Sequence, residues 1–178
     1  MLIFLLGFMG SGKSHCGKKI AVHLGVPFID LDEEIEKAEK KSISNLFAEE
    51  GEVEFRKMEA SALRAFVKKY SIDKSSVNAV VSCGGGTPCY HDNMDFMNQH
   101  GLTVWLNPAI EMLVDRLKKG QDHRPLIAGM SEDELEKFRD AVKTAHDVLL
   151  TVVNRLAGLR TRFRRFGFVQ TMHLYCLQ

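Results

Sequence analysis

Residues 7–14 read Gly-Phe-Met-Gly-Ser-Gly-Lys-Ser, and this stretch decides the fold class of the chain. Its spacing, Gly-x-x-x-x-Gly-Lys-Ser, is that of a phosphate-binding loop, in which glycines let backbone N–H groups surround an anion. An apolar run at residues 2–6 precedes the loop, and a helical pattern over residues 13–24 follows it. Strand, loop and helix in this order favour nucleotide binding over the alternative, a plain glycine turn.

Each position of the loop has a predicted role in holding ATP and Mg²⁺. Lys13 brings a full positive charge to the β- and γ-phosphates, and the Ser14 hydroxyl is placed to bind Mg²⁺. The N-terminus of the following helix adds partial positive charge. The backbone cradle for the phosphates is expected at Gly7, Gly10, Ser11 and Gly12.

Apolar and helical segments alternate along the chain, which predicts an α/β fold. This order favours a parallel sheet with helices on both faces, and ligands then bind beyond the carboxyl ends of the strands. One predicted helix shows an apolar face made by Phe55, Met58, Ala62 and Phe66. The predicted strands are 27–31, 78–83, 102–107 and the run at 2–6, and the predicted helices are 13–24, 42–48, 53–70, 93–99 and 108–118.

Composition excludes several classes of function. The chain has 178 residues, enough for a single domain over 1–178, and 45% of them are apolar. A net charge of +1 gives no case for nucleic-acid binding, and no apolar run approaches the ~20 residues of a membrane span. The first residues do not resemble a signal peptide, and the four cysteines form no Cys-x-x-Cys pair. We therefore expect a cytoplasmic monomer with reduced thiols that binds a small molecule.

Two carboxylates follow the second predicted strand, at Asp30 and Asp32. Strand alternation would place both on one side, with Leu31 on the other. Beside a phosphate loop, one acid would reach Mg²⁺ through a water and the other would accept a hydrogen bond from a substrate hydroxyl. The alternative is that Asp32 caps a helix.

Arginines and glycines mark a further set of candidate site residues. Arg56 points off the apolar face of its predicted helix and would grip a carboxylate, or would be a solvated surface arginine. Gly84, Gly85 and Gly86 follow a buried strand. Their lack of side chains would let the backbone approach a ligand closely, or would simply make a flexible connection. Arg124 lies in a polar segment, residues 118–136, predicted to be a lid that delivers a cation to the transferred phosphoryl group. Arg116 would stack on the adenine or would be a helix-surface residue.

Taken together, these motifs resemble the shikimate kinase family over residues 1 to about 142. The carried motifs are the loop at 7–14, Phe-Ile-Asp-Leu-Asp at 28–32, Gly51-Glu52 leading to Phe55-Arg56, Cys-Gly-Gly-Gly-Thr at 83–87, and Arg124-Pro125-Leu126.

The resemblance implies a five-stranded parallel P-loop kinase fold that phosphorylates the 3-hydroxyl of shikimate with ATP. It implies that Lys13, Asp32 and Arg124 are catalytic and that Ser14 and Asp30 serve the metal. Asp32 would orient or deprotonate the acceptor hydroxyl. Arg56 would bind the shikimate carboxylate, and Gly84–Gly86 would line the same pocket.

The last part of the chain departs from this family. Residues 143–178 hold six Lys or Arg and one Asp, whereas residues 1–142 hold 18 Lys or Arg and 22 Asp or Glu. Residues 139–151 lack the second carboxylate-binding arginine and the aromatic pair of similar proteins, and no last strand or closing helix is evident after them. We hypothesise a reading-frame shift near residue 143, because codons for 143–152 re-read one base later allow Lys-Gln-Arg-Met-Thr-Phe-Tyr-Ser-Gln. The alternative is a genuine divergent tail.

Three further interpretations follow from these observations. The chain could be a related small-molecule kinase, such as a gluconate kinase. It could also bind nucleotide without efficient catalysis, because the shikimate carboxylate loses one cationic partner unless Arg139 or Arg155 replaces it. Nucleic-acid binding by the basic tail is the least favoured, since no exposed aromatic residues are patterned with its arginines.

Overall fold

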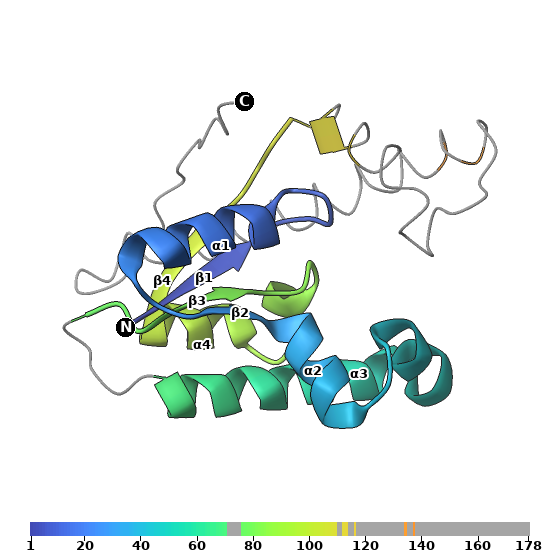
Figure 1. Ribbon diagram of the computed structural model, residues 1–178. Coiled ribbons are helices and arrows are strands. Elements are labelled where there is room, and N and C mark those ends of the chain that lie inside the picture. Colours follow the sequence, from blue (N-terminus) through green and yellow to red (C-terminus); the bar gives the residue numbers. More distant parts are fainter. Residues whose placement is uncertain (71–75, 110–111, 114–115, 117–133, 135–136, 138–178) are drawn as a thin grey trace.

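Within the described residues of this computed structural model, four parallel strands form one sheet in the order β2-β3-β1-β4 (Figure 1). The structure describes residues 1–70, 76–109, 112–113, 116, 134 and 137. The strands are β1 (Leu2–Leu6), β2 (Phe28–Asp30), β3 (Ala79–Ser82) and β4 (Gly101–Trp105). The helices are α1 (Lys13–Leu24), α2 (Leu31–Glu39), α3 (Ile43–Tyr70), η1 (a 3₁₀ turn, Thr87–Cys89) and α4 (Asn93–His100). The predicted α/β class with a parallel sheet is confirmed.

The sheet is covered on both faces, which explains why its strands are almost continuously apolar. Alternate residues of β1 belong to the two cores: Leu2, Phe4 and Leu6 to one, Ile3 and Leu5 to the other. α1 lies over the Ile3 side, and α2, α3 and α4 lie over the opposite side (Figure 1). All four strands point their carboxyl ends the same way, so the residues that follow them meet at one edge.

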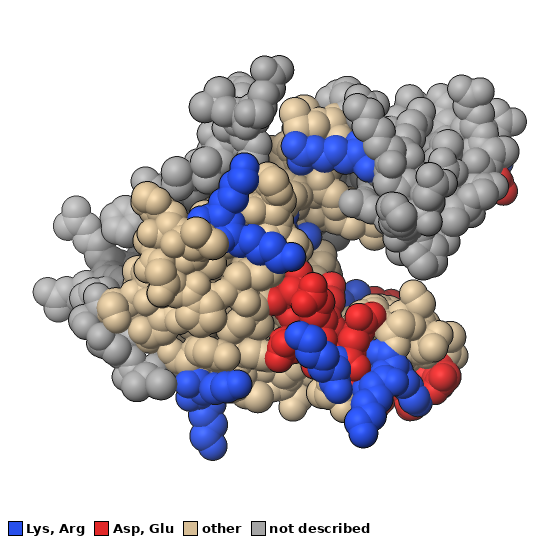
Figure 2. Space-filling model, in the orientation of Figure 1, with Lys and Arg blue, Asp and Glu red and all other residues tan. Residues whose placement is uncertain are grey.

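One predicted strand is wrong at its end, and a helix was missed there. β2 stops at Asp30, and α2 begins at Leu31 with Asp30, not Asp32, as its N-cap. The strand alternation expected for the two carboxylates therefore does not hold, because Asp32 lies in the first helical turn. Leu31 and Ile35 are buried on one side of α2. The acidic residues in its first turn stabilise the helix by interacting with the positive N-terminal end of its dipole. Figure 2 shows these acidic side chains gathered over α2.

Helix α3 joins two segments that the sequence predicts separately. Gly51, at φ 79° and ψ 168°, interrupts the helical backbone between them. The predicted apolar face is displaced: Phe55, Leu63 and Val67 are buried, whereas Met58, Ala62 and Phe66 pack at its margin. The displacement matters because it carries Glu59, four residues after Phe55, into the core.

Several expectations fall on residues that the structure does not describe. These are the fifth strand, Arg124, the tail 143–178 and, apart from Glu134, the lid 118–136. The predicted helix 108–118 is described only in part. Beyond residue 109 the structure describes residues 112, 113 and 116, and these three are helical. In the part of the chain that is described, no helix is both long and apolar enough to cross a membrane.

Candidate active site

The phosphate loop connects β1 to α1 and turns sharply on its glycines. Gly7, Gly10 and Gly12 have φ of 144°, 79° and 93°, a backbone region that other residues rarely adopt. The ammonium of Lys13 folds back over the loop and donates to the carbonyl of Gly7 at 2.8 Å and to that of Phe8 at 3.2 Å. The loop therefore holds a positive charge at the N-terminus of α1, as an anion site requires.

Ser14 and Asp30 lie together beside this loop and fit a Mg²⁺ site. The Ser14 hydroxyl donates to Asp30 Oδ2 at 2.8 Å, and Asp30 Oδ1 accepts from the backbone N–H of Asp32 at 3.3 Å. Hydroxyl and carboxylate oxygens are ligands that Mg²⁺ prefers. Among the described residues no group of three or more His, Cys, Asp or Glu could hold a metal. Mg²⁺ itself binds through one or two carboxylates together with substrate phosphates.

Asp32 has the properties of a proton acceptor. Burial first, and then the neighbouring carboxylates Asp30 and Glu59, raise the pKa of its carboxyl to about 6, while Lys13 acts in the opposite direction. A carboxylate with a pKa near the working pH is an effective general base. The two acids after β2 thus have different environments, although strand alternation is not what places them.

Arg56 is not a solvated surface arginine, because its side chain is only 14% exposed. Its Nη1 donates to Glu59 at 3.0 Å, and its Nη2 and Nε donate to one oxygen of Glu52 at 3.2 and 3.4 Å. Burial opposes the guanidinium charge, yet Glu59 and Glu52 outweigh it and raise the pKa of Arg56. Three rings also surround the guanidinium carbon, with centroids at 4.6 to 5.6 Å: Tyr90, Phe55 and Phe47.

The three glycines after β3 pass between the parts of the site. A Cβ on Gly85 would lie 3.8 Å from the Gly7 carbonyl oxygen. A Cβ on Gly84 would lie 3.1 Å from Asp32 Oδ1 and 2.7 Å from Glu59 Oε1, and one on Gly86 would lie 2.6 Å from Arg56 Nη2. Space for close approach, rather than flexibility, is what positions 84 and 86 require of glycine, whereas a Cβ at position 85 would make only ordinary van der Waals contacts.

Of the two arginines predicted to bind nucleotide, Arg116 lies among the described residues and Arg124 does not. Arg116 Nη1 lies 3.4 Å from the carbonyl oxygen of Gly10 and 3.5 Å from that of Ser11, so its guanidinium sits against the phosphate loop. Stacking of Arg116 on an adenine stays a prediction. Arg124 lies outside the described residues, and its role over the transferred group also stays a prediction.

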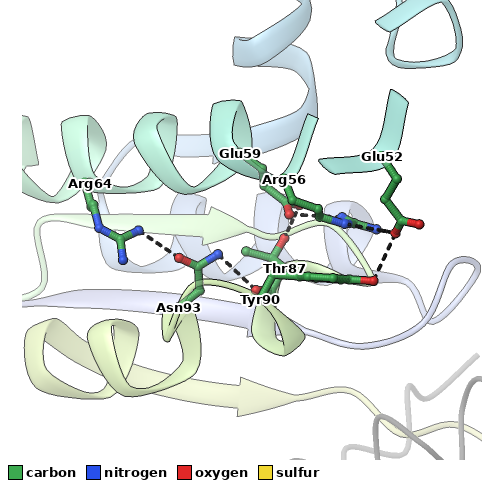
Figure 3. A network of polar contacts seen from close by, with 7 residues as sticks. All are labelled: Glu52, Arg56, Glu59, Arg64, Thr87, Tyr90 and Asn93. Carbon is green, nitrogen blue, oxygen red and sulfur yellow. Dashed lines mark hydrogen bonds and ion pairs between the residues drawn. The ribbon is translucent and has the colours of Figure 1, made fainter. Parts of the chain in front are cut away.

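The sequence prediction missed Glu59 and Thr87, both fully buried. The Thr87 hydroxyl donates to Glu59 Oε1 at 2.5 Å (Figure 3). A signal for Glu59 was present, since a charged residue four positions after Phe55 and four before Leu63 interrupts an apolar helix face. A threonine after three glycines carries no comparable signal.

Comparisons with known proteins agree with this geometry. The family model described as shikimate kinase matches residues 9–156. A shikimate kinase of Bacteroides thetaiotaomicron is 45% identical over 136 residues, which cover 76% of this chain and 74% of that protein. A shikimate kinase of Persephonella marina is 41% identical over 79% of this chain and 81% of its own length.

Solved structures give the same result. A crystal structure of the shikimate kinase from Bacteroides thetaiotaomicron has a TM-score of 0.73 at 36% identity, covering 90% of this chain and 98% of that one. The shikimate kinase from Acinetobacter baumannii, solved in complex with shikimate, has a TM-score of 0.61 at 27% identity, covering 92% and 95%. The match of the family model across most of the chain, together with these relatives, shows that the chain belongs to the shikimate kinase family.

Proposed function

We propose that this chain transfers the γ-phosphoryl group of ATP to the 3-hydroxyl of shikimate. One observation carries the proposal: the turn Gly84–Gly86 lies against Asp32, the phosphate loop and Arg56 in succession. An acceptor lying along this turn meets a phosphate site, a proton acceptor and a carboxylate-binding cation. Shikimate, a hydroxylated ring with a carboxylate, has the groups that these residues recognise.

On the acceptor side, Arg56 binds the carboxylate and Asp32 handles the hydroxyl. A guanidinium has five N–H donors, and within the described residues Glu52 and Glu59 engage three of them. Two donors remain, the number that a bidentate grip on a carboxylate needs. With a pKa of about 6, Asp32 is largely ionised at neutral pH and accepts a hydrogen bond from the attacking hydroxyl, and then its proton.

On the phosphate side, Lys13 and the loop N–H groups position the transferred group and neutralise its charge. Ser14 and Asp30 would hold Mg²⁺, directly or through water, and the bound ion would neutralise charge on the β- and γ-phosphates. We assign Arg116 to the nucleotide because it already lies against the loop. Arg124 is assigned to the transferred phosphoryl group on sequence grounds alone.

The test is a coupled assay of ADP release by the purified 178-residue chain with ATP and Mg²⁺. ADP release that depends on shikimate, and does not occur with gluconate, supports the proposal. Release with gluconate instead would favour the related small-molecule kinase. Asp32→Asn serves as the control, because loss of the proton acceptor should lower kcat about 10²- to 10⁴-fold while ATP binding persists.

The composition of the tail favours a second candidate, a nucleotide-binding chain with impaired catalysis. If the second cationic partner of the shikimate carboxylate is lost, affinity falls by about 10- to 100-fold. ATP binding measured by calorimetry, without ADP release in the assay above, would support this candidate. A version with the alternative frame restored after residue 143 should then recover turnover, whereas resequencing that finds an intact frame across codons 140–145 removes the frame-shift hypothesis.

A further inference from the structure

A chain of polar contacts runs from Arg56 away from the phosphate loop and ends at the start of α4 (Figure 3). Thr87 is its central member. The hydroxyl of Thr87 donates to one oxygen of Glu59, and the other oxygen of Glu59 accepts from Arg56. Arg56 is thus linked to Thr87 through the carboxylate of Glu59, while its bonds to Glu52 hold the other side of the guanidinium.

Burial makes this dependence strong. The side chains of Thr87 and Glu59 are both 0% exposed. A buried carboxylate oxygen that loses its donor has no water to replace it, and this loss is costlier than losing an exposed contact. The Thr87 hydroxyl therefore fixes where Glu59 Oε1 lies, and the rigid carboxylate then fixes where Oε2 receives the guanidinium.

Thr87 is itself held from the side opposite to the substrate. Asn93 donates from Nδ2 to the Thr87 carbonyl at 3.1 Å, and Arg64 donates to Asn93 Oδ1 at 2.8 Å. Arg64 also donates to the carbonyl of His91 at 2.8 Å. His91 and Asp92 have φ of 49° and 53°, a costly conformation that persists only where neighbours fix it.

The same residue anchors the triglycine turn. The backbone N–H of Thr87 donates to the carbonyl of Gly84 at 3.2 Å. A displacement of Thr87 would therefore move the turn and Arg56 together, and both form the wall that receives the acceptor. The hydrogen bonds of Thr87 run to Glu59, Asn93 and Gly84, all outside the phosphate loop, so we expect its main effect on the acceptor.

We propose that Thr87, braced by Asn93 and Arg64, is a positioning residue for the carboxylate of the acceptor. It acts through Glu59, which sets the Arg56 guanidinium, and it does not touch the reacting atoms. The inference rests on the proposed function, because it assumes that Arg56 binds the carboxylate of shikimate.

The test compares Thr87→Val, which removes only the hydroxyl's hydrogen-bonding capacity, with Thr87→Ser, which keeps it. Thr87→Val should raise KM for shikimate about fivefold, less than the loss of a direct hydrogen bond to a charged group because Thr87 acts through Glu59 and Arg56, while kcat and KM for ATP stay within about twofold. Thr87→Ser should restore KM. Equal KM values in Thr87→Val and the unchanged chain, or equal defects in both variants, would overturn the proposal.

A second measurement does not require activity. The Arg56 Nε–H resonance, identified as the signal lost in Arg56→Lys, should shift or broaden in Thr87→Val and be normal in Thr87→Ser. If the unchanged chain fails to phosphorylate shikimate but this signal responds, the proposed function falls and the positioning stands. A signal that stays unchanged in Thr87→Val overturns the positioning whatever the activity.

The remote brace gives a variant that folding tolerates. Arg64 is half-buried, and lysine keeps its charge but cannot reach Asn93 and the His91 carbonyl together. Arg64→Lys should raise KM for shikimate about twofold, less than Thr87→Val does, because it loosens Thr87 without removing its hydroxyl. A KM equal to that of the unchanged chain would overturn the role given to Arg64.

Discussion

The two walls of the site are built in different ways. The phosphate wall comes from eight consecutive residues, Gly7–Ser14, and its loop curves on glycines around one lysine. The acceptor wall gathers single side chains from α3 and the turn after β3, and it works through hydrogen bonds between them. Backbone recognition is local and readable as a motif, whereas side-chain recognition depends on how distant segments pack.

This difference predicts different kinetic signatures. A group on the phosphate wall acts on charge that develops during transfer, so its loss should appear in kcat. In the proposed function, a group on the acceptor wall binds the carboxylate, which does not change during the reaction, so its loss should appear in KM for shikimate.

Lys13→Met should give a larger effect than any change at Arg56, Thr87 or Tyr90, and it tests the phosphate wall. Removal of the ammonium should lower kcat about 10²- to 10³-fold, because one stabilising charge on the transferred group is lost. Direct binding of shikimate, measured by calorimetry, should remain within about twofold. A large loss of shikimate binding would break the division between the two walls.

Asp32→Asn tests the junction of the walls through stability rather than rate. The pKa of Asp32 is raised from 3.8 to about 6 on folding, so ionised Asp32 opposes folding fully above that pH, and the opposition fades as pH falls from about 6 to about 4. The variant should therefore gain stability over the unchanged chain by up to about 3 kcal/mol more at pH 8 than at pH 4.

The measurement is the free energy of unfolding in urea, with a chelator present so that no bound cation changes the pKa of the Asp32 carboxyl. Glu33→Gln is the matched control, since that side chain is 60% exposed and should show little difference between the two pH values. An Asp32→Asn gain that is equal at pH 4 and pH 8 would contradict the raised pKa.

How much of the site could be predicted follows the same division. The motif at 7–14 was enough to place β1, the loop and α1 with their observed bounds, because its physics is contained in eight neighbouring residues. Asp30 and Asp32 were selected for a wrong geometric reason. The predicted strand continued one residue too far, into the first residue of α2. The sequence Asp-Leu-Asp is compatible both with a strand and with a helix capped by Asp30.

The acceptor wall was predicted only in part. Arg56 was selected by resemblance, and its pairing with Glu59 is an i,i+3 contact within α3, but the bond of Glu59 to Thr87 depends on the rotation of α3 against the turn after β3. The predicted apolar face of α3 was displaced toward its margin, and this displacement hid the burial of Glu59. Pairing across 28 residues of sequence leaves no local pattern.

Arg56→Lys tests the acceptor wall directly and should have a smaller effect than Lys13→Met. Lysine keeps the charge but loses the planar fork, so KM for shikimate should rise about 10- to 30-fold with kcat within about threefold. Steady-state kinetics at varied shikimate and saturating ATP measure both. If kcat falls and KM is unchanged, Arg56 acts on the transition state, and the proposed separation of binding from transfer is wrong.

Tyr90→Phe should give the smallest effect, because it removes an exposed contact to the same guanidinium cluster. The Tyr90 hydroxyl donates to Glu52 at 3.0 Å, but Glu52 is 53% exposed and is held by Arg56 as well. Water can replace the lost donor, and phenylalanine keeps the ring that lies 4.6 Å from the guanidinium carbon. KM for shikimate should therefore change less than about twofold, against the larger change expected for buried Thr87→Val. Equal effects of the two variants on KM would contradict this expectation. They would mean that the number of hydrogen bonds lost, and not their burial, determines how much an acceptor-wall contact affects shikimate binding.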